Sequence, residues 1–140
     1  MTDIPTLLPP DRTPPIRTPD DLLRQWQAFM GPLGFGSRML WFVFIDHEGH
    51  VMPELPCIED LPITPDRRTL RNVIEMCQEV VASVFDPGTT VAFLLTRPGG
   101  ALLTASDRAW GQGLVGEGRR AALPMQPVFI ANDDEVRLLV

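Results

Sequence analysis

Side chains that could take part in chemistry gather in two short stretches of the sequence. The first begins with the apolar run Val91–Leu95, continues through Arg97-Pro98-Gly99-Gly100 and ends at Asp107. This order predicts a buried strand, a tight loop and the start of a helix, a setting in which many folds place functional groups. Thr104 and Asp107 are spaced as a helix N-cap pair, because each side chain can accept a hydrogen bond from an unpaired backbone N–H.

The second stretch is Asp46-His47-Glu48-Gly49-His50. Two imidazoles at His-x-x-His spacing, with carboxylates beside them, can bind a transition metal. The same residue types are also common in turns. The sequence therefore leaves two interpretations open: a weak metal site that combines His47, His50 and Asp107, or a plain turn.

Other sequence motifs of catalysis are missing. Cys57 and Cys77 have neither CxxC spacing nor a histidine at the spacing of a nucleophile motif, so we expect two reduced packing residues. Ser106 does not lie in a Gly-x-Ser-x-Gly motif. Segment 111–116 has the letters Gly-x-Gly-x-x-Gly, but it follows a predicted helix start instead of a strand. The sequence predicts no cofactor.

Composition limits the classes of function further. The chain has 140 residues, which suits one domain, and 44% of them are apolar. No apolar run approaches the ~20 residues of a membrane helix, and the N-terminus lacks the apolar centre of a signal peptide. The formal net charge of -6 disfavours binding to the phosphate backbone of nucleic acid. We therefore expect a cytoplasmic protein that binds neither membrane nor nucleic acid.

The chain divides into a tail and one domain. Six prolines fall within residues 1–19, which predicts an extended or disordered tail that could lie on a partner protein. Residues 20–140 form the predicted domain. Helix-start signals at Thr18-Pro19 and Thr64-Pro65 predict two helices, which end at Gly31-Pro32 and at Asp86-Pro87-Gly88.

The remaining elements define the fold class. Strands are predicted at 39–45, 51–52, 91–95, 128–130 and 136–139, with the first pair and the last pair forming β-hairpins, and an irregular or edge segment at 53–62. A third helix begins near Ala105, and its four later glycines predict that it is broken or frayed. The expected fold is α+β, with a mixed, mainly antiparallel sheet flanked by helices.

From Arg38 to the C-terminus this order resembles the JAMM (MPN) metalloprotease-like fold, and its RadC-like branch in particular. The end of the family's hairpin is matched by Ile45-Asp46, and its helix start is matched loosely by Pro65-Asp66-Arg67. The family signature is His-x-His-Pro-Ser-Gly followed by Ser-x-x-Asp. Here these positions hold Leu95-Thr96-Arg97-Pro98-Gly99-Gly100 and Thr104-Ala105-Ser106-Asp107, one residue short in spacing. The resemblance implies a JAMM/cytidine-deaminase-like architecture.

The departures from the family concern its chemistry. Zinc in such a site needs two imidazoles and a carboxylate, and a further carboxylate acts as general base. Leu95 and Arg97 stand at the histidine positions, and Arg38 stands at the glutamate position. Asp107 alone remains of the ligand set. The resemblance thus implies a JAMM-like fold with no catalytic residues and no metal.

These substitutions suggest a physical hypothesis. Arg97 could replace the charge of the metal and pair with Asp107, and with Arg38 and Thr104 it would form a candidate anion pocket, for instance for a peptide carboxylate. Alternatively, both arginines are surface groups and Asp107 only caps its helix.

Two functions remain open at this stage. The first is a non-catalytic interaction or regulatory module that binds another protein, with a homodimer as a further option. The second is a metal-dependent hydrolase with a rearranged site around Asp107, His47 and His50.

Overall fold

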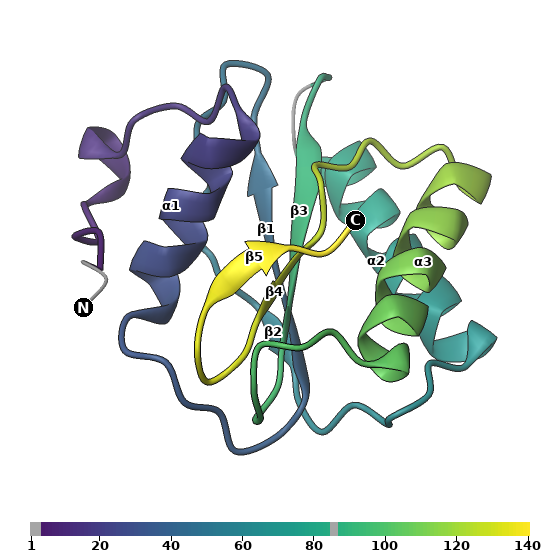
Figure 1. Ribbon diagram of the computed structural model, residues 1–140. Helices are drawn as coiled ribbons and strands as arrows, with labels where there is room; N and C mark the ends of the chain where they lie inside the picture. The colour runs from purple at the N-terminus through teal and green to yellow at the C-terminus, as the bar shows by residue number, and fades with distance from the viewer. Residues whose placement is uncertain (1–3, 85–86) are drawn as a thin grey trace.

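A computed structural model describes residues 4–84 and 87–140 of the chain, and within them three layers are stacked. Figure 1 shows the sheet in the middle, one helix against its first face and two helices against its second. The elements in chain order are η1 (Pro10–Arg12), α1 (Pro19–Met30), β1 (Met39–Ile45), β2 (Cys57–Ile58), α2 (Arg67–Val84), β3 (Thr90–Thr96), α3 (Ala105–Arg120), β4 (Phe129–Ala131) and β5 (Val136–Leu138).

The sheet has five strands in the order β2-β1-β3-β4-β5. β1 lies antiparallel to both of its neighbours, and its register with β3 runs from Met39 opposite Thr96 to Ile45 opposite Thr90. β3 and β4 are parallel, and β4 and β5 are antiparallel. The prediction of an α+β fold with a mixed, mainly antiparallel sheet is confirmed.

The core has one part on each side of the sheet. α1 covers one face, where Leu22 and Trp26 pack against alternate residues of the strands, such as Leu94. α2 and α3 cover the other face, where Ile74 and Trp110 pack against the intervening residues. β3 is apolar at nearly every position because both of its faces are buried. None of the described helices combines the length and the apolar character that crossing a membrane requires.

Helices α1 and α3 are both capped by the threonine that precedes them. Thr18 accepts a hydrogen bond from the backbone N–H of Asp21, and the Asp21 carboxylate accepts one from the backbone N–H of Thr18. Thr104 and Asp107 form the equivalent reciprocal pair at α3. The N-cap pair predicted from the spacing of Thr104 and Asp107 is therefore present.

The prediction that α3 is broken or frayed was wrong. The helix runs without interruption from Ala105 to Arg120, through all four glycines. Three of them allow close packing: a Cβ on Gly113 would lie 2.6 Å from Leu70 Cδ1, one on Gly111 would lie 2.9 Å from Leu139 Cδ2, and one on Gly118 would meet Met125 Sδ. Packing against neighbouring segments thus outweighs the low helix propensity of glycine.

One of the two predicted hairpins needs adjustment. The predicted hairpin of 39–45 with 51–52 is reduced to one bridge, between Ile45 and Val51, and a hydrogen bond from Met52 N to Phe44 O at 2.9 Å. The same edge of β1 is then paired by β2, while β3 lies on the other edge. The irregular segment contributes β2, which is an edge strand. The C-terminal hairpin is confirmed as β4 and β5. The predicted end of the second helix includes Asp86, which lies outside the described residues.

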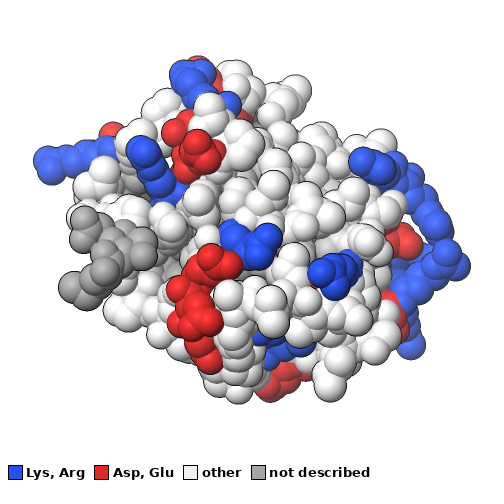
Figure 2. Space-filling view, in the orientation of Figure 1, with Lys and Arg blue, Asp and Glu red and all other residues white. Residues whose placement is uncertain are grey.

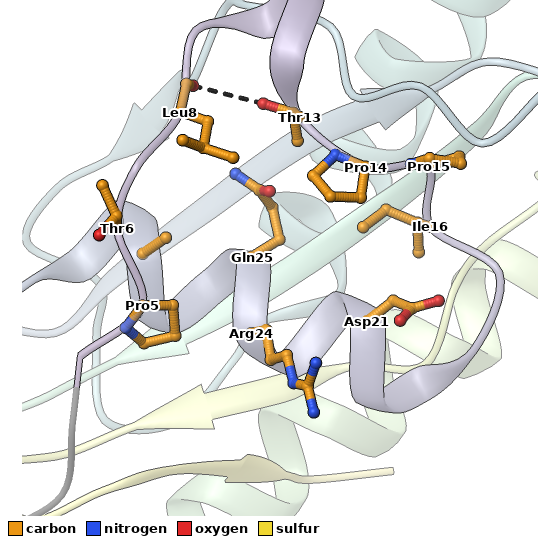
Figure 3. A pocket seen from close by; sticks show the side chains of 11 residues that line it. Pro5, Thr6, Leu8, Thr13, Pro14, Pro15, Ile16, Asp21, Arg24 and Gln25 are labelled. Carbon is orange, nitrogen blue, oxygen red and sulfur yellow. Dashed lines mark hydrogen bonds between the residues drawn. The ribbon is translucent and has the colours of Figure 1, made fainter.

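Residues 4–18, the described part of the proline-rich segment, are mostly extended, but they pack more closely than their composition suggests. Ile16 is buried on the α1 side of the sheet, and its backbone N–H donates to Gly49 O at 2.7 Å. Figure 3 shows the segment arching over α1, with Thr13 Oγ1 donating to Leu8 O at 3.3 Å. A cavity of about 210 Å³ lies between this segment and α1.

Candidate functional site

Strand register brings the candidate site residues together. Arg38 directly precedes β1 and Arg97 directly follows β3, and Met39 lies opposite Thr96 in the antiparallel pair. The two arginines therefore leave adjacent strands at the same end of the sheet. The loop after Arg97 then places Asp107 in the first turn of α3, beside both guanidinium groups.

Arg97 and Asp107 form a buried, multiply bonded ion pair. Arg97 Nε lies 2.8 Å from Asp107 Oδ1 and 2.9 Å from Oδ2, and Arg97 Nη2 lies 2.8 Å from Oδ2. The same guanidinium donates from Nη2 to Leu102 O at 2.9 Å and from Nη1 to Pro98 O at 3.0 Å. Four of its five N–H groups are thus used within its own loop and helix start.

Two further groups complete the environment of Asp107. Arg38 Nη1 donates to Oδ1 at 3.1 Å, and the Thr104 backbone N–H donates to Oδ2 at 2.9 Å. An ionised carboxylate has about four lone-pair positions, and four donor groups now point at this one. The hypothesis that Arg97 and Asp107 pair describes the geometry better than the alternative of surface arginines.

Burial makes this pair different from a surface ion pair. The Asp107 side chain is fully buried, the Arg97 side chain is 6% exposed, and the Arg38 side chain is 14% exposed. Burial by itself raises the pKa of the Asp107 carboxyl, but hydrogen bonds from Arg97, Thr104 and Arg38 outweigh it and hold the pKa below its usual value. Asp107 is therefore ionised at neutral pH, with its charge balanced by two guanidinium groups.

The arrangement does not suit a zinc ion. The side chain of Leu95 is buried and offers no ligand atom. Arg97 carries a permanent positive charge beside the Asp107 carboxylate, and this charge would repel a metal ion. The Asp107 oxygens already accept bonds from four donors, so a metal would have to displace them. No catalytic step follows from this site.

The loop that carries Arg97 is held by a residue that the sequence analysis did not single out. The backbone N–H of Gly99 donates to Asp133 Oδ2 at 2.8 Å, and the backbone N–H of Asp133 donates to Gly99 O at 3.0 Å. Arg97 N also donates to Ala131 O at 3.1 Å. Asp133 lies in the turn between β4 and β5, and the parallel pairing of β3 and β4 brings this turn beside Gly99.

The structure does not bring the two histidines to Asp107. Asp46 follows the end of β1, whereas Arg38, which contacts Asp107, precedes its start. The histidine turn and Asp107 are therefore separated by the length of this strand, ~20 Å or more. His47 and His50 lie near Glu48, with nitrogen to oxygen distances of 3.6 Å each. Among residues 4–84 and 87–140, no group of three or more histidine, cysteine or acidic side chains is arranged to hold a metal ion.

The 46–50 segment has the geometry of a plain turn. Asp46 Oδ1 accepts from the backbone N–H groups of Glu48 at 2.9 Å and His50 at 2.8 Å. Partial burial raises the pKa of the Asp46 carboxyl, but these backbone hydrogen bonds outweigh that effect and the net pKa is lowered.

The two cysteines lie on elements that do not carry the candidate site residues. Cys57 is in β2, and Cys77 is buried in α2, where burial raises the pKa of its thiol to about 12.

Comparison with known proteins adds no assignment. No protein-family model, no curated protein and no solved structure matches the chain at a significant level. The JAMM resemblance therefore rests on the residues quoted from the sequence.

Proposed function

We propose that the protein is a non-catalytic interaction or regulatory domain with a JAMM-like fold, in which an internal ion pair stands where metalloproteases of that fold bind zinc. The observation that supports it most strongly is the Arg97–Asp107 pair. Its carboxylate is buried and accepts from four donors, and its guanidinium is bonded to the same loop and helix start. A site of this kind stabilises structure and leaves no group free to activate water.

The partner proposed here is another protein, in the cytoplasm as the composition suggests. The proline-rich segment offers a contact surface, because Ile4, Leu7 and Leu8 are 49%, 52% and 40% exposed on an extended chain. Proline-rich extended segments lose little conformational entropy when a partner binds them. Arg38, whose side chain is 14% exposed, is the part of the candidate anion pocket that a carboxylate of the partner would reach.

A binding experiment with matched variants tests this proposal. Tagged wild-type protein would be compared with a Leu7→Asp/Leu8→Asp variant in affinity purification followed by mass spectrometry. Met76→Asp is the control, because Met76 is 40% exposed and lies on α2, across the sheet from the segment. We expect proteins that are retained by the wild type and by the control and lost by the double variant. If all three forms retain the same proteins, the segment is not the binding surface.

A further inference from the structure

The two edges of the sheet are protected to different degrees. β2 has only two residues, and Pro53 and Pro56 lie just before it, which limits pairing with another strand. β5 forms the opposite edge, and its three residues contain no proline. In Figure 1 this strand lies in front of the rest of the sheet, at the edge nearest to the viewer. An unpaired edge presents a row of backbone donors and acceptors to another strand.

The hydrogen-bond pattern shows which backbone groups of β5 face outward. Asn132 N donates to Glu135 O at 3.0 Å, and Leu139 N donates to Val128 O at 2.8 Å. The backbone N–H and C=O groups of the odd-numbered residues 135, 137 and 139 therefore point toward β4. Antiparallel strands alternate strictly in this respect. The N–H and C=O groups of Val136 and Leu138 therefore point away from the sheet.

Apolar side chains at this edge are accessible, next to the exposed charged side chains of Asp134, Glu135 and Arg137. Leu138 and Val140 are 49% and 44% exposed. A cavity of about 830 Å³ lies between α3 and the C-terminal residues, with Val115, Met125 and Leu138 among its lining. A second cavity of about 440 Å³ opens toward α1 and includes Leu33 and Val136. The edge thus has space on both of its sides.

The charges on β5 fit a second copy of the same strand. Glu135 and Arg137 have opposite charge, flank Val136, and are about half exposed, with Arg137 Nη1 3.8 Å from Glu135 Oε1. If two copies pair antiparallel about a two-fold axis at Val136, each Glu135 lies directly opposite the other copy's Arg137. Opposite charges at such cross-strand positions are stabilising. Figure 2 shows the same face, where acidic and basic side chains adjoin each other beside a broad uncharged area.

We propose that the protein forms a two-fold homodimer by antiparallel pairing of β5 with β5 of a second copy, which joins the two sheets into one. The outward N–H of Val136 in each copy would donate to the C=O of Val136 in the other copy, and Leu138 of each copy would lie opposite Asp134 of the other. This surface is separate from the Arg97–Asp107 pair, so the dimer and the non-catalytic role can fail independently.

Charge exchange at β5 tests the dimer. Sedimentation velocity of the full chain over a range of concentrations should show a dimer that weakens at high salt. Glu135→Arg and Arg137→Glu should each weaken dimerisation by about tenfold or more, because like charges then face each other. The double variant Glu135→Arg/Arg137→Glu should restore it. Arg71→Glu, an exposed substitution on α2 away from this edge, is the control.

A backbone variant gives a second, independent test. Leu138→Pro removes an outward N–H for which the described residues provide no acceptor, so it should reduce dimerisation while circular dichroism and thermal unfolding stay close to those of the wild type. A wild-type protein that stays monomeric at all concentrations would overturn the proposal. A dimer that is unaffected by the single charge reversals would also overturn it, since its interface would then lie elsewhere.

Discussion

The carboxylates of Asp21 and Asp107 show how burial changes the role of one residue type. Both lie at the third position of a helix and complete the same capping box with a threonine. Asp21 is partly exposed, and backbone hydrogen bonds from Arg17 and Thr18 lower its pKa. Asp107 is fully buried and depends in addition on two arginines. The cap is a local feature, whereas the ion pair links β1, β3 and α3.

Replacing these two aspartates should therefore have unequal effects. Asp107→Asn leaves two guanidinium groups without their counter-charge, and breaking a buried pair in this way costs about 3–5 kcal/mol. Asp21→Asn removes only an accessible cap, so we expect a clearly smaller loss. Urea unfolding at pH 7 measures both. Equal losses would mean that Asp107 acts only as a helix cap.

The difference in unfolding free energy between the wild type and Asp107→Asn should depend on pH. Because the pKa of Asp107 is lowered in the folded protein, its ionised form adds stability above the unfolded-state pKa of about 3.9. That contribution is lost as pH falls through the lower folded-state value. Unfolding free energies measured from pH 7 downward should thus converge below about pH 4. A difference in unfolding free energy that stays constant across this pH range would show that the charge of Asp107 does not stabilise the fold.

A double variant separates charge compensation from packing. Arg97→Met alone leaves Asp107 with Arg38 as its remaining charged partner, whereas Asp107→Leu alone leaves both guanidinium groups without a counter-charge. The two substitutions together leave an apolar pair beside Arg38, whose side chain is 14% exposed. Replacement of both partners of a buried pair is often far less costly than removal of one. We expect the double variant to unfold at a higher urea concentration than either single variant. A loss equal to the sum of the two single losses would show that the groups act independently.

The residue types suggested the pairing as one of two alternatives, but they did not indicate its full environment. A cation and a carboxylate at either end of a glycine-rich loop suggest an ion pair, and the structure places Arg97 and Asp107 in contact. The carbonyl groups of Pro98 and Leu102 could not be anticipated as partners, because their positions depend on the path of the loop. Asp133 could not be found either, since its contact depends on the pairing of distant strands.

At the scale of single elements, α3 shows where local preference fails. The helix-start signals were sufficient to predict that α1 and α2 exist, because these signals are local. The predicted start of the second helix at Thr64-Pro65 was too early, because α2 begins at Arg67 and Asp66 accepts the hydrogen bond from the Thr69 backbone N–H. The glycines of α3 were misread, because the sequence does not show what lies against them. Gly113 faces Leu70 of α2, and Gly111 faces the C-terminal residues.

Two glycines of α3 form a matched pair for testing this explanation. A Cβ on Gly113 would lie 2.6 Å from Leu70 Cδ1, whereas one on Gly116 would meet nothing within 4 Å. Gly116→Ala should therefore stabilise the protein by about 0.5–1 kcal/mol through helix propensity. Gly113→Ala should destabilise it by about 1–3 kcal/mol, as overpacking does. Thermal unfolding of both variants checks this, and stabilisation by Gly113→Ala would show that α2 and α3 pack less closely.

At the scale of the whole molecule, topology decides which residues can act together. The sheet places Arg38, Arg97 and Asp107 at one end of β1, and the 46–50 turn at the other. Fold class could be predicted because it follows from the order of helices and strands. The separation of Asp107 from His47 and His50 could not, because nothing in their spacing indicates how the chain returns to the sheet.

The proposed non-catalytic role requires that the Arg97–Asp107 ion pair leave no place for a catalytic metal. The most direct test is elemental analysis of purified full-length protein, together with thermal unfolding in the presence of zinc and of a chelator. We predict no stoichiometric metal and no change in the unfolding temperature under either condition. Zinc near one equivalent, lost on Asp107→Asn substitution and accompanied by chelator-induced destabilisation, would contradict the claim and restore the metal-dependent interpretation.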